Sequence, residues 1–350
     1  MLVASPRTYL LHNSTPIELI IGLESHVQLS SGCKLFSGSA SAAFVLDVGT
    51  PGSLPSVNLF DVVGFGALAT VLDCKLATWL SFTRKGYFCV DLALGYQTTQ
   101  QQNPLMAWGK VAVHMFNING TVCVRTAHVR SVSLEHDAGR MIGFPSLKAV
   151  DFKRSGIGLL EITSFPCFDS ISFVKLYLLK LRLVLSSLGL SSCAMADART
   201  RFDFNFSMNE PLADYSARTE VKNLNSVSSL NAVLLAEVSR LRCSRIASTK
   251  TVNFKTLTTL FLRRKQREYS LLFEPNVPPV RVSSSVQAFV QALSLGFGLC
   301  WFSSFGLVSS FALSFSDFSN YLELTFSNFG FKLLGWTLKR ELCKTVSLIA

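Results

Sequence analysis

Several short segments of this chain place ionisable side chains two residues apart. Glu24 and His26 form one such pair, and Glu135 and Asp137 form another. Residues two apart in an extended strand point to the same side, so each pair would face one surface of a sheet. Two further segments show the same alternation, with Arg201, Asp203, Asn205 and Ser207 in one and Arg218, Glu220 and Lys222 in the other.

If these segments lie on one sheet, they form a face that mixes carboxylates with cationic groups. Carboxylate oxygens are the ligands that a hard cation such as Mg²⁺ prefers, and Lys and Arg side chains suit phosphate oxygens. This combination is typical of phosphoryl transfer, which depends on positioning and charge neutralisation. Two simpler interpretations stay open. Alternating polar residues are common on a solvated strand face, and a lone histidine such as His26 is more often a hydrogen-bonded residue than a ligand.

Motifs of other enzyme classes are missing from the sequence. It contains no P-loop, GxGxxG, HExxH or GxSxG pattern. Their absence argues against an ordinary NTPase, dehydrogenase, zinc protease or serine hydrolase.

The elements that would hold the polar residues can be predicted from hydrophobic periodicity. Strands are expected at Pro16–Leu29, Val122–Leu134 and Arg201–Ser207, helices at Leu59–Leu80, Ser170–Gly189 and Ser228–Arg242, and loops at Gly49–Asn58 and Thr83–Gln102. The segment Ser170–Gly189 is the clearest helix, because its apolar residues recur at helical spacing between Lys and Arg residues.

The composition favours a folded chain with a polyanionic partner. The 350 residues suffice for two or three domains, and 49% hydrophobic with 16% charged residues excludes a disordered chain. The formal net charge of +11 arises from 33 Lys and Arg against 22 Asp and Glu. Such a charge favours nucleic acid or an anionic membrane surface as the partner.

Membrane, export and zinc signals are weak. Ala288–Phe315 is long enough to span a bilayer, but Gln291 and six serines interrupt it, so a buried helical region is the alternative. Met1–Thr15 has no apolar core of a signal peptide and is expected to be a short extension. The nine cysteines form no CxxC pair, which favours reduced thiols in a cytoplasm and no cysteine-based zinc site.

The same polar segments, in the same order, resemble a known family. The motifs are Ile21–Leu29 (IGLESHVQL), Pro51–Asn58, Arg84–Phe88 with Asp91–Gln100, Leu134–Gly139, Asp151–Ile162, Arg201–Ser207, Glu220–Ser226 (EVKNLNS) and Arg267–Pro279. They resemble the B subunit of the aspartyl/glutamyl-tRNA amidotransferase, the GatCAB complex. Eight motifs in order over roughly residues 16–280 make this resemblance specific.

The resemblance implies an α+β fold. We expect an N-terminal extension at 1–15, a kinase-like cradle domain with mixed or antiparallel sheets and flanking helices at 16–280, and a short helical domain at 281–350, with the tail domain of the family absent. In this interpretation Ala288–Phe315 belongs to the shortened helical domain rather than to a membrane span.

The resemblance also implies an activity. The B subunit of the family uses ATP and Mg²⁺ to phosphorylate the side-chain carboxylate of Glu-tRNA(Gln) or Asp-tRNA(Asn). Ammonia that the amidase (A) subunit releases from glutamine then gives Gln-tRNA or Asn-tRNA, while the small (C) subunit holds the heterotrimer together. We therefore expect a glutamine-hydrolysing, tRNA-dependent carbon–nitrogen ligase of translation, located in a bacterial-type cytoplasm in preference to an organellar matrix, with no membrane partner.

Site residues carry over by matching position. The resemblance predicts metal ligands at Glu24, His26, Glu135 and Glu220 with Asp137 and Asp203 in support, phosphate-side cations at Lys85 and Lys222, and ATP-binding or positioning groups at Tyr87, Asp91, Asn205, Asn223 and Asn225. Candidate catalytic residues are Glu24, His26, Glu135, Glu220, Lys85 and Lys222.

The chain departs from the family pattern at several positions. His136 replaces a second glutamate of the family, and Ala196 replaces another acid. The segment after Leu35–Phe36 lacks the cysteines that some members carry, so no structural zinc is expected. Two other hypotheses stay open: a non-catalytic scaffold that binds tRNA or the amidase subunit, and a membrane-anchored protein.

Overall fold

The computed structural model describes residues 9–12, 15–43, 59–86, 89–116, 121–143, 148–195, 199–209, 219–224, 232–233, 236, 249–252, 259–263 and 271–282. These residues all belong to one compact unit, Met1–Leu295. The predictions for the helical domain beyond residue 282, including Ala288–Phe315, and for the loop Gly49–Asn58 lie outside the described residues. Among the residues described, no helix is both long enough and apolar enough to cross a membrane.

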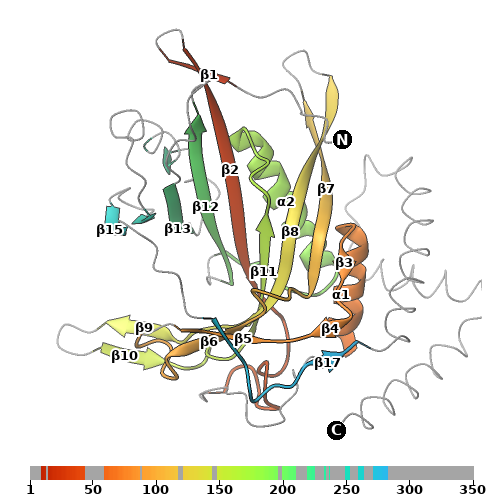
Figure 1. Cartoon of the computed structure of the whole chain (residues 1–350), viewed down its shortest axis with the longest axis vertical. Coiled ribbons are helices and arrows are strands. Elements are labelled where there is room, and N and C mark those ends of the chain that lie inside the picture. The colour runs from red at the N-terminus through yellow and green to blue at the C-terminus, as the bar shows by residue number, and fades with distance from the viewer. Residues whose placement is uncertain are drawn as a thin grey trace, which may run out of the picture. The chain divides into compact units, whose positions relative to one another are not determined.

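A sheet of ten strands dominates the described part of the chain (Figure 1). Its order is β15 (Thr259–Arg263), β14 (Thr249–Val252), β13 (Thr219–Leu224), β12 (Thr200–Asn209), β2 (Thr15–Gln28), β11 (Gly158–Ser164), β8 (Val122–His136), β7 (Met106–Phe116) and β3 (Lys75–Leu76), with β1 (Tyr9–His12) paired to β2. All neighbouring strands are antiparallel except β13 and β14, which are parallel. The predicted strands Pro16–Leu29, Val122–Leu134 and Arg201–Ser207 are confirmed as β2, β8 and β12.

Smaller sheets accompany the main one. They are the three-stranded sheet β16-β5-β6 and the pairs β9 with β10 and β4 with β17, whose bounds are β16 (Leu271–Phe273), β5 (Thr83–Gly86), β6 (Tyr96–Thr99), β9 (Arg140–Gly143), β10 (Lys148–Asp151), β4 (Trp79–Leu80) and β17 (Val280–Arg281). The prediction of a loop over Thr83–Gln102 is therefore wrong at β5 and β6. Both strands are short and polar, and their register is set by pairing with each other and with the distant β16, which no local pattern indicates.

Helix α2 (Ile171–Ser187) confirms the prediction for Ser170–Gly189. The hydroxyl of Ser170 accepts a hydrogen bond from the Phe173 amide at 3.4 Å and caps the helix N-terminus. Gly189, at φ 68°, donates its amide to the Ser186 carbonyl at 3.0 Å and ends the helix.

Helix α1 (Leu59–Val71) is shorter than predicted. Its apolar spacing continues to Leu80, but the chain turns at Asp73, whose φ is 49°. The Cys74 amide donates to the Ala69 carbonyl at 2.7 Å, and the following residues enter β3 and β4. Of the helix expected over Ser228–Arg242, only Ala232, Val233 and Ala236 are described, and these are helical.

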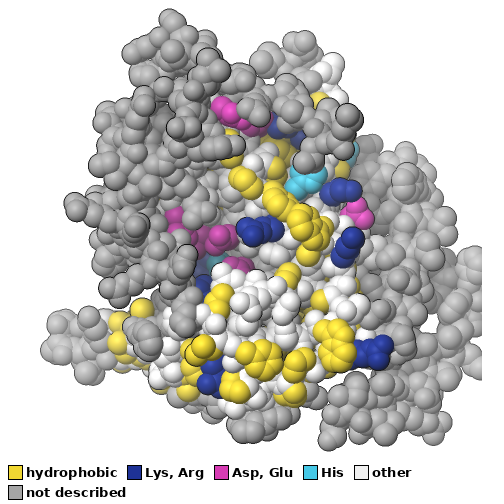
Figure 2. Space-filling view, viewed as in Figure 1, with side chains coloured by type: hydrophobic (Ala, Val, Ile, Leu, Met, Phe, Trp, Pro, Cys, Tyr) yellow, Lys and Arg dark blue, Asp and Glu magenta, His cyan; other side chains and the backbone are white. Residues whose placement is uncertain are grey.

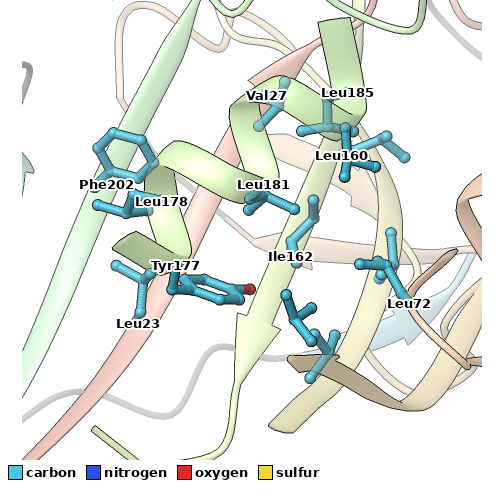
Figure 3. Close-up of a cluster of buried hydrophobic side chains, with 14 of the residues drawn as sticks. Leu23, Val27, Leu72, Leu160, Ile162, Tyr177, Leu178, Leu181, Leu185 and Phe202 are labelled. Atoms are coloured by element: carbon cyan, nitrogen blue, oxygen red, sulfur yellow. The ribbon is translucent and has the colours of Figure 1, made fainter. Parts of the chain in front are cut away.

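The hydrophobic core lies against one face of the sheet. Figure 3 shows side chains of α2 packed against inward-facing residues of the strands. The helix contributes Tyr177, Leu178, Leu181 and Leu185, and the strands contribute Leu23, Val27, Leu160, Ile162 and Phe202. Each fully buried side chain of this kind contributes roughly 1.5–3 kcal/mol to folding. Because side chains alternate along a strand, the residues between these apolar positions must face the opposite side. Glu24, His26, Glu161 and Asp203 occupy those intervening positions.

Candidate active site

Strand register brings Glu24, His26 and Asp203 together. Glu24 of β2 is the direct partner of Asp203 of β12, and His26 lies two residues along the same face of β2. One ligand atom from each of these three side chains lies within 4.8 Å of the others. All three were predicted as metal ligands, and the structure places them in one group.

A second group shares His26. Nδ1 of His26 lies 3.5 Å from Oε2 of Glu135, and ligand atoms of His26, Glu135 and Glu161 lie within 4.8 Å of one another. Glu135 is buried, and its other oxygen accepts a hydrogen bond from the Thr99 hydroxyl at 2.8 Å. Nε2 of Gln97 donates to Oε2 of Glu135 at 3.4 Å. Strand β6 therefore supplies the polar groups that hold this carboxylate in place.

The ionisation of these groups follows from burial and from one ion pair. Burial lowers the pKa of His26, but the hydrogen bond and negative charge of Glu135 outweigh it and raise that pKa to about 9. Burial raises the pKa of Glu135, but His26 and Lys85 bring it down to about 2. Burial, reinforced by the charge of Glu135, raises the pKa of Glu161 to about 8. Burial also raises the pKa of Glu24.

Lys222 joins Glu220 to the cluster. Its Nζ lies 2.7 Å from Oε1 of Glu220 and 3.6 Å from Oδ2 of Asp203. Asn205 is the strand partner of both Gly22 and Glu220, which places its side chain beside the same carboxylates. Oε2 of Glu220 and Oδ1 of Asn205 are buried and have no hydrogen-bond partner within the described part of the chain. These two oxygens without a partner, close to the carboxylates of Glu24 and Asp203, favour binding of a cation.

The sequence that forms this site matches a family of known proteins. The family model described as GatB/GatE catalytic domain matches residues 19–288. The chain belongs to this family. The match covers the whole carboxylate cluster, from Glu24 to Lys222, and it confirms the resemblance inferred from the motifs.

Curated relatives carry related names. A protein of Mycoplasma mycoides, named as the B subunit of an aspartyl/glutamyl-tRNA(Asn/Gln) amidotransferase, is 33% identical over 282 residues, which are 76% of this chain and 58% of the relative. A protein of Alcanivorax borkumensis with the same name is 31% identical over 286 residues, 77% of this chain and 59% of the relative. The human mitochondrial protein named as the B subunit of glutamyl-tRNA(Gln) amidotransferase is 32% identical over 282 residues, 75% of this chain and 50% of the relative. The chain thus spans between half and three fifths of the length of these relatives.

Asp137 lies at the edge of the cluster rather than in either group of ligand atoms. Its Oδ1 lies 3.0 Å from Nη2 of Arg201, and its Oδ2 lies 3.2 Å from Nε of Arg154. Two guanidinium groups satisfy this carboxylate, so in this arrangement it orders the end of β8. Arg201 is the strand partner of His26, which connects the two regions.

The structure describes some of the remaining predicted site residues and not others. Lys85 lies on β5, and its positive charge lowers the pKa of both Glu135 and Glu161. Oδ1 of Asp91 is buried without a hydrogen-bond partner in the described residues. Tyr87 and Asn225 lie outside the described residues, and for Asn223 only the backbone in β13 is described.

His136, the residue that replaces a family glutamate, faces away from the cluster. Its Nδ1 accepts a hydrogen bond from the Thr98 amide at 2.8 Å, and its side chain is buried. Burial lowers the pKa of His136 to about 4, so the imidazole is neutral. The substitution therefore removes no ligand from the two groups of carboxylates described above.

Glu161 and Thr99 are site residues that the sequence patterns did not assign. Glu161 is the strand partner of His26 on one side and of Ser133 on the other, which places it in the middle of the polar face. It lies within one of the family motifs but was not predicted to belong to the site. A signal was available, because it is the single charged residue in this strand.

Proposed function

We propose that this chain provides the catalytic domain of the B subunit in a tRNA-dependent amidotransferase. In this proposal it uses ATP and Mg²⁺ to phosphorylate the side-chain carboxylate of Glu-tRNA(Gln) or Asp-tRNA(Asn). Ammonia supplied by the amidase subunit then replaces the phosphate, giving Gln-tRNA or Asn-tRNA for translation. The names of the relatives support the tRNA-dependent reaction, and the bacterial ones favour a cytoplasmic location.

The observation that carries the proposal is the carboxylate cluster inside the matched domain. Glu24, Asp203, Glu135 and Glu161 gather around His26, and two of them have a raised pKa because they are buried near other acids. His26 and Lys222 offset part of the repulsion between these acids, and a bound cation would offset more of it. Oxygen donors, including the orphaned oxygens of Glu220 and Asn205, suit Mg²⁺. The donor set therefore fits the metal that the proposal requires.

In this proposal the acidic residues would bind the metal and the lysines would bind phosphate. Glu24 and Asp203, which belong to one group of ligand atoms, would hold Mg²⁺ with Glu220 completing the set, and Glu161, from the group that shares His26, would lie beside them. The cation, when bound, screens the repulsion between the substrate carboxylate and the ATP phosphates. Lys222 and Lys85 would contact phosphate oxygens and stabilise the charge that develops during transfer. The ion pair of His26 with Glu135 fixes the imidazole between the two carboxylate groups.

Phosphorylation has a clear chemical purpose in this proposal. A carboxylate is a poor electrophile because its charge repels a nucleophile and it lacks a leaving group. Transfer of the γ-phosphoryl group to a carboxylate oxygen creates an acyl phosphate. Attack by ammonia on the acyl carbon then forms the amide, and the C–O bond to phosphate breaks. The amidase (A) and small (C) subunits are the proposed protein partners, and the misacylated tRNA is the proposed substrate.

The test is reconstitution of the reaction. The chain is co-expressed with the amidase and small subunits, then supplied with Glu-tRNA(Gln), ATP, Mg²⁺ and glutamine. We expect ATP-dependent formation of Gln-tRNA, lost in Glu24→Gln and retained in the matched variant Asp73→Asn, whose carboxylate is exposed and outside the cluster. If tRNA binds but no amide forms, the enzyme proposal is wrong and a non-catalytic scaffold remains.

A further inference from the structure

Strands β7 and β8 lie beyond the carboxylates in the sheet, and an aromatic pair is found there, formed by Trp108 of β7 and by Phe165, the residue that follows β11. Trp108 of β7 is 65% exposed. Its ring lies 5.5 Å from that of Phe165, centroid to centroid, at an interplanar angle of 32°. Figure 2 shows an apolar strip flanked by Lys, Arg and His side chains on the same face as a group of Asp and Glu side chains.

The backbone holds Trp108 in an unusual conformation. Its φ is 62°, a left-handed value that is unfavourable for a bulky side chain. Ala107 pairs with Ser131 and Gly109 pairs with Val129, so Trp108 lies opposite Arg130 but is not itself a paired residue. A Cβ atom at the next residue, Gly109, would overlap Sγ of Cys74, so only glycine fits at that position. Strained conformations of this kind concentrate at functional sites, and here the strained residue carries a large ring that is mostly exposed to solvent.

Strand register relates the aromatic pair to the carboxylate cluster. Ala107, Ser131, Thr163 and Glu24 are successive partners across β7, β8, β11 and β2. Neighbouring strands lie about 5 Å apart, so Ala107 and Glu24 are separated by about 15 Å across the face. Trp108 lies one residue beyond this row. A few nucleotides of single-stranded RNA can span that distance.

The charge around the rings is positive. Strands β7 and β8 carry Lys110, His114, His128 and Arg130 and no acid before Glu135. The ion pair of Lys110 with Asp73, at 3.4 Å, is exposed, and such pairs are weak. Arg130 is exposed and lies opposite Trp108 on the neighbouring strand. A protein-docking surface is usually depleted in lysine, whereas exposed aromatic rings among basic groups are typical of single-stranded nucleic-acid binding.

We propose that Trp108 and Phe165 form a stacking platform for an unpaired base of single-stranded RNA, with Arg130 and Lys110 beside the backbone phosphates. An aromatic face stacks on any base, and cationic side chains along the strand follow the phosphates. Resting on the proposed function, this RNA is the unpaired 3′ end of the tRNA acceptor stem. The platform binds it as its aminoacylated terminus approaches Glu24.

The test compares two RNA hairpins that differ in one feature. One is an acceptor-stem minihelix with its unpaired 3′ nucleotides, and the other is the same minihelix with those nucleotides removed. We expect Trp108→Ala in the full chain to weaken binding of the first by about 5- to 150-fold and to leave binding of the second unchanged. Phe165→Leu, which keeps apolar packing, should weaken the first by a smaller factor.

The matched control is Trp79→Ala. Trp79 is 53% exposed but lies on β4, outside the main sheet, so its loss should leave both affinities unchanged. Arg130→Gln should reduce the slope of log affinity against log salt by about 1. Equal loss for both hairpins, or none, in Trp108→Ala overturns the platform. Loss of binding to the amidase subunit, with RNA affinity unchanged, overturns it in favour of a protein interface.

Failure of the platform and failure of the proposed function give different results. If the wild-type chain supports ATP-dependent amidation but Trp108→Ala binds the tailed minihelix normally, the platform is wrong and the enzyme proposal stands. If Trp108→Ala loses the tailed minihelix but the wild-type complex forms no amide, the platform stands and the enzyme proposal is wrong.

Discussion

Glu24 and Asp203 are direct partners across two antiparallel strands, and their carboxylates lie on the same face of the sheet. Like charges placed opposite each other destabilise a sheet, and burial raises the pKa of Glu24 in addition. His26 and Lys222 offset part of this repulsion. The fold therefore keeps a locally unfavourable pair of acids, which is expected where a cation binds.

Removing one of these charges should stabilise the metal-free chain. We expect Glu24→Gln to raise the free energy of unfolding by a few tenths to about 1 kcal/mol without Mg²⁺. Added Mg²⁺ should raise the Tm of the wild-type chain but not of the variant, because a ligand stabilises the state that binds it. Thermal unfolding with and without Mg²⁺, with Asp73→Asn as control, measures both effects. An unchanged Mg²⁺ response in Glu24→Gln would contradict the assignment.

Lys222 should be needed for both stability and activity. Its ammonium contacts Glu220 and Asp203, so Lys222→Met leaves two carboxylates without their cation. We expect a loss of about 1–3 kcal/mol, below the full value for a buried pair because 32% of the side chain is exposed. Lys222→Arg should restore part of the stability. Lys175→Met on α2 is the matched control, and urea denaturation separates the variants. Equal stability of the two Met variants would disprove the role.

The sequence predicted the parts of the site whose strands carry their own alternation. In β12 the apolar and polar residues alternate strictly, and in β2 Glu24 and His26 lie two residues apart within an apolar strand, so the strands and the shared face of Glu24 and His26 and the face of Asp203 were predictable. Glu161 was not predicted because β11 carries no second charged residue that would mark a polar face, and the position of Glu161 depends on pairing with β2 and β8. Thr99 was not predicted as a site residue because β6 forms by pairing with β5, whose other partner is the distant β16.

Glu161 should be replaceable without loss of stability. Because burial raises its pKa to about 8, the side chain is mostly protonated at pH 7, and glutamine mimics that form. In the unfolded chain the pKa is 4.5, so the folded state binds more protons between pH 4.5 and 8. Stability therefore falls as pH rises through this window. Glu161→Gln should flatten that fall. The same pH slope in both proteins would contradict the raised pKa.

Arg84 should be required because it neutralises a buried acid. Nε and Nη2 of Arg84 bind the two oxygens of Glu274 at 2.8 and 2.7 Å, and Glu274 is 1% exposed. Arg84→Met leaves the buried carboxylate of Glu274 without a cationic partner, and we expect the free energy of unfolding to fall by about 3 kcal/mol. The double variant Arg84→Met with Glu274→Gln should recover much of it. Arg84 precedes Lys85 on β5, so amidation should fall in the single variant. Equal stability of the single and double variants would exclude this account.

His136 should make the stability of the chain depend on pH below neutrality. In the unfolded chain its pKa is 6.5, and burial lowers it to about 4 in the folded chain. The folded imidazole must stay neutral so that Nδ1 can accept the Thr98 amide. Its contribution is fully present above pH 6.5 and is lost as pH falls toward 4, amounting to about 3 kcal/mol. His136→Asn keeps an acceptor near the same place but does not titrate. Chemical denaturation between pH 7 and 4 should show a smaller loss in this variant, and equal losses would assign the pH dependence to other groups.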